Sequence, residues 1–315
     1  MPPLPKISHD QIRGAVQRSG YLVEYRIEQV LGRYGYSVQA NQAYPDPITR
    51  KSRELDVTAI AGVGITSDWL NSIWSRLLIE CVNNPQPIGF FTKTPETPTT
   101  HIFDLKCSGV PVKIKKGKEW TKLSDFLDMQ RYHHHCKGKI ATQYCSFTAK
   151  KGTNPIEWLA QHEDTHFGSF DKLCFALDHE INQHYAHTRL RVKETVNVQM
   201  YYLILVASGE LVEIMPARKE VKLRAANHIH YVQSYITNGR EQIYHIDVVT
   251  EKYLRRLLNI IDDELQKTVR LFRRRKEIIQ QSVDQITTSV KGLRSPDAIR
   301  SRVEYRGPWG THDPS

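Results

Sequence analysis

Two short apolar runs, each interrupted by a carboxylate, constrain the fold of this chain more than any other feature. Residues 53–59 read Arg-Glu-Leu-Asp-Val-Thr-Ala, and residues 77–83 read Leu-Leu-Ile-Glu-Cys-Val-Asn. Their aliphatic and β-branched content predicts two strands. A carboxylate inside such a strand needs a counter-charge, and a divalent metal is the commonest counter-charge that brings chemistry with it. The two interrupting acids are Asp56 and Glu80.

Alternation along a strand predicts where these acids point. Successive side chains take opposite faces, so Asp56 shares a face with Thr58 while Leu55 and Val57 take the other. If the two strands pair, Asp56 and Glu80 converge on one Mg²⁺ ion. That cation takes one or two carboxylates together with waters and phosphate oxygens. A metal held in this way orients a phosphodiester and lowers the pKa of a bound water.

A glutamate upstream of the two strands completes a known pattern. Residues 20–24 read Gly-Tyr-Leu-Val-Glu in an expected helix, and residues 53–57 and 78–81 carry the two strand acids. This order of helix glutamate, strand aspartate and next-strand glutamate resembles the PD-(D/E)XK, or restriction-endonuclease-like, nuclease superfamily. The resemblance covers about residues 8–93. It implies an α/β fold with a mixed sheet flanked by helices, and Mg²⁺-dependent cleavage of DNA phosphodiesters.

The resemblance also implies a role for each acid. Asp56 and Glu80 are expected as ligands of Mg²⁺ or Mn²⁺, and Glu24 as a helix carboxylate that assists them. Glu28 is a nearby competitor for the helix position. Glu54, beside the strand aspartate, is expected to form a structural ion pair rather than to bind metal.

One position departs from the family pattern. The family's lysine stands two residues after the strand glutamate, where this chain has Val82 on the same face as Glu80. That lysine neutralises charge at the scissile phosphate and positions the attacking water, and valine can do neither. A lysine from elsewhere in the chain is able to take its place. Lys93 is the first candidate, ahead of Lys51 and Arg53.

Two functions of different classes follow from this departure. The first is a Mg²⁺-dependent DNA endonuclease or exonuclease, acting in restriction, phage defence or repair. The second is a catalytically impaired nuclease-fold module that binds DNA or a protein partner, and it predicts that no lysine ammonium lies near the two acids. The chain has no Walker loop, no Gly-x-Ser-x-Gly elbow and no Rossmann glycine run that would indicate another chemistry.

The composition favours a polyanionic partner inside the cell. The chain carries 44 Lys and Arg against 34 Asp and Glu, a formal net charge of +10, as expected of a DNA-binding protein. No apolar stretch reaches the length of a membrane span, and the N-terminus lacks a signal-peptide core. The five cysteines include no Cys-x-x-Cys pair and are expected as reduced thiols. We therefore expect a cytoplasmic protein without a membrane segment.

Periodicity divides the chain into three parts. We expect a nuclease-like α/β domain over residues 1–248, a long C-terminal helix over 249–292 and a flexible tail over 293–315. In the domain, helices are expected over 9–18, 21–34, 68–76, 120–130 and 170–185, strands over 36–38, 53–59, 77–83 and 88–91, a loop over 44–47, and hairpins over 199–215 and 228–249.

The C-terminal helix carries two further expectations. Apolar residues spaced by threes and fours from Leu254 to Val290 predict a packing seam for another helix, hence a homodimer. Lys267, Arg270 and Arg274 lie along one side, where they are placed to contact a DNA backbone. The alternative for this side is a solvated face.

Two groups of histidines invite a metal interpretation. Residues 133–136 read His-His-His-Cys, and imidazole and thiolate are zinc ligands. Consecutive helical residues point in different directions, so a polar helix end is favoured over zinc here. His228 and His230 share one strand face and are expected on a half-solvated sheet.

Overall fold

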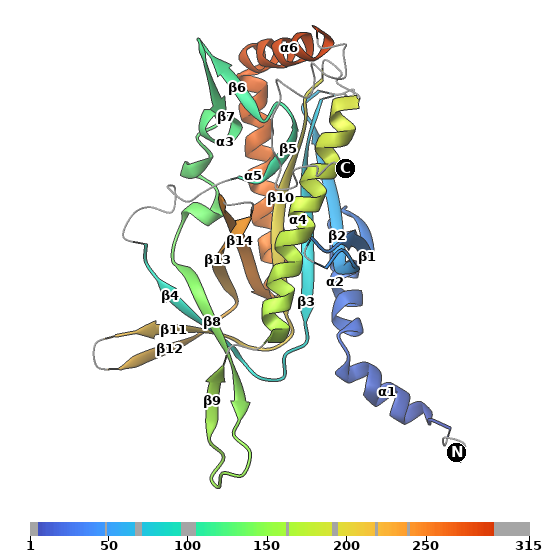
Figure 1. Ribbon diagram of the computed structural model, residues 1–315, viewed down its shortest axis with the longest axis vertical. Coiled ribbons are helices and arrows are strands. Elements are labelled where there is room, and N and C mark those ends of the chain that lie inside the picture. The colour runs from blue at the N-terminus through green and yellow to red at the C-terminus, as the bar shows by residue number, and fades with distance from the viewer. Residues whose placement is uncertain are drawn as a thin grey trace, which may run out of the picture.

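A large mixed sheet with helices on both faces forms the centre of the molecule, as expected for the fold class (Figure 1). The computed structural model describes residues 6–47, 49–66, 71–95, 105–161, 164–190, 195–217, 220–237 and 240–292. Within these residues the sheet has twelve strands. Ten of them follow the order β1-β2-β3-β10-β14-β13-β8-β4-β11-β12, while β5 pairs with β10 and β9 with β8.

The first two helices form where the sequence predicts them. The first begins at Ser8, whose hydroxyl accepts a hydrogen bond from the Gln11 N–H while the Gln11 side chain accepts one from the Ser8 N–H. This reciprocal capping satisfies two donors that the helix itself cannot. The second ends before Gly35, which has a positive φ of 79°. The elements of this part are α1 (His9–Arg18), α2 (Tyr21–Arg33), β1 (Ser37–Pro45), β2 (Ser52–Gly64), β3 (Ser72–Val82) and β4 (Ile88–Lys93).

Two local expectations in this part are wrong. The helix expected over 68–76 is a strand from residue 72 onward, and residues 67–70 lie outside the described part. The strand β3 pairs along its whole length with β10 in parallel and, from Ser72 to Ile79, with β2 antiparallel. Backbone hydrogen bonds on both edges outweigh a short stretch of helical spacing. The loop expected over 44–47 begins two residues late, because β1 continues to Pro45.

The middle of the chain contains one long helix. The helix expected over 120–130 is mostly wrong, since Trp120 belongs to β7 and the helical segment has only four residues. The helix expected over 170–185 is confirmed within a longer one that covers one face of the sheet (Figure 1). The elements are β5 (Cys107–Val110), β6 (Lys113–Lys116), β7 (Glu119–Lys122), α3 (Leu123–Phe126), β8 (Ile140–Ala149), β9 (Trp158–Gln161) and α4 (Asp164–Leu190), with the 3-10 helices η2 (Met129–Arg131) and η3 (His134–Cys136).

One of the two expected hairpins forms. The strands β13 and β14 pair antiparallel, with Ile229 opposite Val248. The strands β10 and β11 are joined by a short turn but do not pair with each other: β10 lies between β3 and β14, and β11 pairs with β4 and β12. The strands are β10 (Asn197–Ala207), β11 (Leu211–Pro216), β12 (Val221–Ala226), β13 (His228–Thr237) and β14 (Arg240–Thr250).

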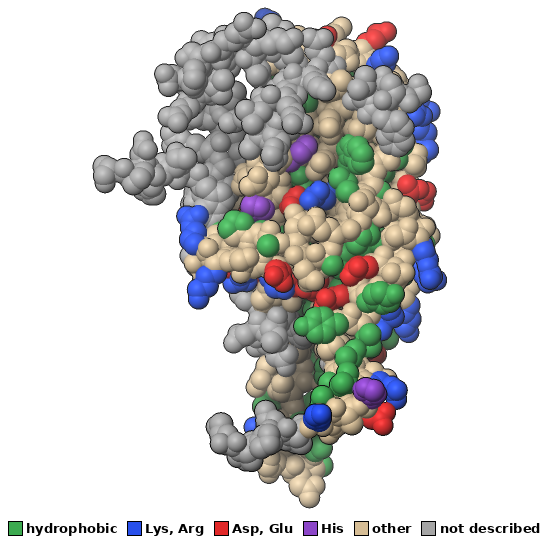
Figure 2. Space-filling model, turned by 90° about the vertical axis from the view of Figure 1, so that its right-hand side faces the viewer, with side chains coloured by type: hydrophobic (Ala, Val, Ile, Leu, Met, Phe, Trp, Pro, Cys, Tyr) green, Lys and Arg blue, Asp and Glu red, His purple; other side chains and the backbone are tan. Residues whose placement is uncertain are grey.

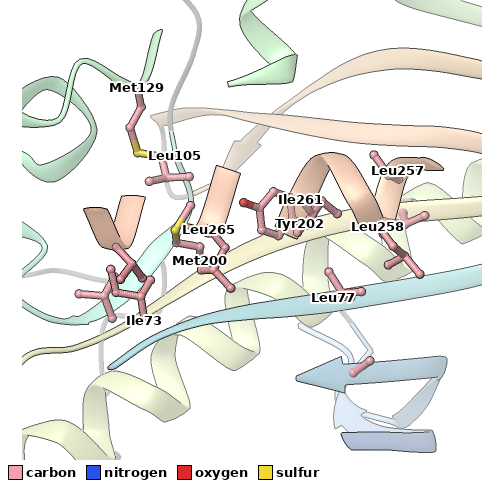
Figure 3. Close-up of a cluster of buried hydrophobic side chains, with 14 of the residues drawn as sticks. Ile73, Leu77, Leu105, Met129, Met200, Tyr202, Leu257, Leu258, Ile261 and Leu265 are labelled. Carbon is pink, nitrogen blue, oxygen red and sulfur yellow. The ribbon is translucent and has the colours of Figure 1, made fainter. Parts of the chain in front are cut away.

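The long C-terminal helix is divided at Arg275 into α5 (Leu254–Arg274) and α6 (Lys276–Gly292). Its apolar seam packs inside the chain. Figure 3 shows Leu257, Leu258, Ile261 and Leu265 of α5 against side chains of the sheet. The described part of the seam is therefore covered within the chain itself, and a homodimer through this helix stays a prediction. The tail, residues 293–315, lies outside the described residues.

Two hydrophobic cores lie on opposite faces of the sheet. One is formed with α2 and α5, and the other with α4. The strands β3, β10 and β14 therefore bury both of their faces, which explains why β10 is apolar along most of its length. No described helix combines the length and the apolar character that crossing a membrane requires.

Candidate active site

The two predicted acids lie side by side at the end of the β2–β3 ladder. The terminal pair of this ladder is Val57 with Ile79, and Asp56 and Glu80 are the next residues beyond it on the two antiparallel strands. The Cys81 N–H donates to Asp56 Oδ2 at 2.8 Å, and the Asp56 N–H donates to Glu80 Oε1 at 3.3 Å. The expected convergence of Asp56 and Glu80 is therefore present.

The strand β2 does not alternate strictly at this point. Leu55 packs in the core beside α4, whereas Val57 packs in the core beside α2 and α5, so the expectation that they share a face is wrong. On the facing strand β1, Asn41 has a positive φ of 52°. The β1–β2 register has no pair between Ala40–Val57 and Gln42–Leu55, and there the Asp56 carboxylate accepts the Cys81 N–H of the neighbouring strand. By contrast, Glu80 and Val82 share the α4 face as predicted, with Ile79 on the other.

The ammonium that the strand lacks comes from α4. Lys172 Nζ lies 3.0 and 2.8 Å from the two carboxylate oxygens of Glu80 and 3.7 Å from Asp56 Oδ1. The Glu80 side chain is 2% exposed and the Lys172 side chain 29%, so the pair lies at the border between core and solvent. In the sequence, Lys172 stands between the buried residues Phe170 and Leu173. The available signal was that Lys172 borders the apolar stripe of the helix expected over 170–185. Sequence reasoning did not identify it as a site residue.

The lysine and arginine candidates taken from the sequence lie elsewhere. Lys93 is exposed at the end of β4, which is separated from β3 by β10, β14, β13 and β8 in the sheet order. Lys51 is exposed, and Arg53 forms an ion pair with the buried Asp46. Glu54 is also exposed. The structure thus brings Lys172, and not Lys93, to the two acids.

Excess negative charge defines the electrostatics of this group. Burial and the neighbouring Asp56 raise the pKa of Glu80 to about 8, although Lys172 lowers it. Burial raises the pKa of Glu24 as well, and the charges of Asp56 and Glu28 add to this effect. Burial lowers the pKa of Lys172, but the charges and hydrogen bonds of Glu80 and Asp56 outweigh it and give a net increase. Three carboxylates therefore face one ammonium.

The helix α4 is fixed to the sheet at Lys172 itself and again two turns further along. The Tyr44 hydroxyl of β1 donates to the Lys172 carbonyl oxygen at 3.1 Å. Two turns further on, Glu180 pairs with Arg76 of β3 at 2.7 Å and accepts from Gln42 of β1 at 2.5 Å. These contacts fix the position of the Lys172 ammonium relative to Asp56 and Glu80.

The edge of the molecule that carries α1, α2 and β1 is shown in Figure 2. Acidic side chains gather near the middle of this face, and hydrophobic side chains run below them. Exposed apolar residues of α1 and α2 include Ile12, Val16, Tyr21 and Tyr25. Glu24 belongs to the first turn of α2.

The remaining sequence candidates lie on the α5 side of the sheet. Lys267, Arg270 and Arg274 are exposed on α5, and Lys267 Nζ lies 4.2 Å from the centroid of the Tyr132 ring. They do not join the acids, which face α4 and α2, and DNA contact through them stays a prediction. The polar helix end expected at residues 133–136 is wrong, because His133 and His135 are only 1% and 5% exposed.

Comparison of the chain with protein-family models, with curated proteins and with solved structures finds no match. The group formed by Glu24, Asp56, Glu80 and Lys172 is therefore interpreted from its own geometry and chemistry.

Proposed function

We propose that this protein is a Mg²⁺-dependent DNA nuclease of the restriction-endonuclease-like type, with Glu24, Asp56, Glu80 and Lys172 as its active site. The observation that carries the proposal is the ammonium of Lys172, 2.8 Å from Glu80 and 3.7 Å from Asp56. It supplies the cation that the strand position occupied by Val82 lacks. The alternative of an impaired module predicts no ammonium near the acids, so Lys172 counts against it.

The donor set fits a hard divalent cation. Asp56 and Glu80 would hold it through carboxylate oxygens, which Mg²⁺ prefers, and the unbalanced negative charge of three carboxylates favours it electrostatically. When bound, Mg²⁺ supplies charge stabilisation to a phosphoryl oxygen and lowers the pKa of a coordinated water. Glu24 adds negative charge from α2 without itself having to be a ligand.

Each protein group has a separate task. Asp56 and Glu80 are held rigidly, because backbone N–H groups donate to Asp56 Oδ2 and Glu80 Oε1. Lys172 presents its positive charge where an anionic phosphate would approach the acids, and a fixed charge of this kind stabilises negative charge that develops in the transition state. The same ammonium is placed to orient an attacking water. The net charge of +10 supports a polyanionic substrate.

Metal removal tests the proposal directly. Purified protein is incubated with linear, nicked, branched and single-stranded DNA in EDTA, and then with Mg²⁺ or Mn²⁺ in excess over the chelator. We expect no cleavage in EDTA and restored cleavage of at least one substrate with either metal. A Glu80→Gln preparation made in parallel identifies contaminating nucleases, since it should stay inactive. Cleavage that is equal in Glu80→Gln, or that persists in EDTA, would contradict the proposal.

The cleavage rate should rise with pH at low Mg²⁺. A ligating carboxylate must be deprotonated, and the Glu80 pKa of about 8 means that a proton occupies it below that pH. At a subsaturating Mg²⁺ concentration the rate should therefore increase by about tenfold per pH unit below pH 8 and level off above it. Because metal and proton compete, more Mg²⁺ should move the midpoint to lower pH. A midpoint pH that does not change with the Mg²⁺ concentration would contradict the assignment of Glu80 as a metal ligand.

A further inference from the structure

A second cluster of titratable side chains lies on the other side of the sheet from the proposed nuclease site. Its members come from the 3-10 helix η3 and the residue before it, from β13 and β14, and from α5. Asp247 faces the core beside α5, since its strand neighbours Ile246 and Val248 pack in the core beside α4. Within the described residues the cluster consists of His133, His134, His135, His228, His230, His245, Asp247 and Glu264.

Three imidazoles converge on the carboxylate of Asp247, which is wholly buried. His134 Nε2 and His135 Nε2 each lie 3.0 Å from Oδ2, and His228 Nε2 lies 2.8 Å from Oδ1. A tetrahedral zinc ion bound at 2.0–2.1 Å keeps its ligand atoms about 3.3 Å apart. The two distances to Asp247 Oδ2 thus need only a small expansion to admit such an ion, and one ligand atom each of His134, His135 and Asp247 all lie within 4.8 Å of one another.

A second carboxylate fixes the orientation of His134. Glu264 Oε1 accepts the backbone N–H of His134 at 2.6 Å and lies 3.0 Å from its Nδ1. With Nδ1–H donated to Glu264, Nε2 faces Asp247 Oδ2 in one of two ways. It either donates a second N–H, which makes His134 an imidazolium, or presents its lone pair to a cation that lies between the two atoms. Metal-binding histidines are commonly held by a carboxylate in this manner.

Two buried atoms of the cluster lack a hydrogen bond. They are His230 Nδ1 and Glu264 Oε2, on residues that are each 5% exposed. Both residues point into the cluster: the His230 ring stacks on His135 at 4.5 Å between centroids, and Glu264 Oε2 lies 3.5 Å from His133 Nε2. Buried polar groups are normally satisfied, so the hydrogen bonds among the described residues do not by themselves satisfy this cluster.

We propose that His134, His135 and Asp247 bind a divalent transition-metal ion of the Zn²⁺ class, with Glu264 holding His134 as a ligand. Two imidazoles and one carboxylate form a softer donor set than the all-carboxylate nuclease site, and they select Zn²⁺ or its first-row neighbours over Mg²⁺. The site is buried and joins η3 to β14 and, through Glu264, to α5. His134 and Asp247 are 113 residues apart in sequence. The role of the ion is therefore to fix these distant segments to one another.

Zinc titration of the full chain tests the proposal. The protein carries a histidine-free affinity tag and the Asp56→Asn substitution, so that metal held at the nuclease site is not counted. After chelator treatment it is titrated with Zn²⁺ against a chromophoric chelator. We expect roughly one Zn²⁺ per chain, bound by the folded protein. Glu264→Gln should weaken zinc binding by about 10–100-fold, and His9→Gln, at an exposed histidine of α1, should leave it unchanged.

A second measurement covers the case in which Glu264→Gln fails to fold. The Asp56→Asn chain, with Glu264 retained, is loaded with Co²⁺, whose visible absorption in a tetrahedral nitrogen and oxygen site is far stronger than in an octahedral aqua complex. The tetrahedral spectrum, displaced by Zn²⁺, is the expected result. Absence of stoichiometric zinc uptake by folded protein, or an octahedral spectrum, would overturn the proposal. The histidines, Asp247 and Glu264 would then be a hydrogen-bonded network without a metal ion. Neither result depends on whether the chain cuts DNA.

Discussion

Asparagine in place of Asp56 is expected to slow Mg²⁺-dependent DNA cleavage by at least about 1,000-fold, because a metal contributes several kcal/mol to the stabilisation of a phosphoryl transition state. The amide keeps the shape of the side chain and can still accept the Cys81 N–H, which donates to Oδ2 at 2.8 Å in the native chain. It removes the negative charge that binds the cation. Single-turnover cleavage of a DNA substrate at several Mg²⁺ concentrations measures the loss.

Asp10→Asn provides the matched control for this substitution. Asp10 is an exposed aspartate of α1 that pairs with Arg13, and its side chain is 89% exposed. Its loss should leave cleavage unchanged. The fold should survive Asp56→Asn, since the substitution removes a like charge beside Glu80, and thermal unfolding checks this. Retention of a tenth or more of the native rate in folded Asp56→Asn would rule out Asp56 as a metal ligand.

Replacing Lys172 by methionine is expected to lower the cleavage rate by about 100–1,000-fold, the usual cost of removing one fixed group that stabilises transition-state charge. Methionine keeps the apolar stem that packs between α4 and the sheet. The Mg²⁺ concentration for half-maximal rate should not rise, because an ammonium that competes for Glu80 is gone. A lower maximal rate at unchanged or tighter metal dependence separates this role from loss of the metal site.

Two further variants make the Lys172 result decisive. Lys93→Met removes the lysine favoured by the sequence, and its exposed position on β4 predicts full activity. Val82→Lys, introduced into Lys172→Met, returns an ammonium to the strand position on the same face as Glu80 and should recover part of the rate. Loss of activity in Lys93→Met with none in Lys172→Met would reverse the assignment.

The acids were predictable from sequence because their anomaly is local. A carboxylate inside an aliphatic run is visible within seven residues, and the strand pairing that joins Asp56 to Glu80 follows from the order of the elements. Lys172 lies 92 residues beyond Glu80, so no pattern along the chain links the two. Only the packing of α4 on the sheet brings them together.

The wrong predictions share a cause of the same kind. Residues 72–76 have helical spacing, yet they hydrogen-bond to strands on both edges. The seam of α5 has the spacing of a dimer contact, yet the sheet of the same chain covers it. Residues 133–135 look like a polar terminus until β13, β14 and α5 enclose them. The spacing of residues along the chain indicates which face of an element is apolar. Which other element packs on that face depends on how the whole chain folds.

The position of the ammonium on a helix has a consequence for how such an arrangement of side chains would be recognised. Because the ammonium comes from α4, residue 82 of the strand can be apolar. Val82 is only 9% exposed and packs among the apolar side chains beneath α4. A search that reads three letters along one strand passes over a chain built in this way. An arrangement of this kind is visible in the positions of the side chains and not in their order along the sequence.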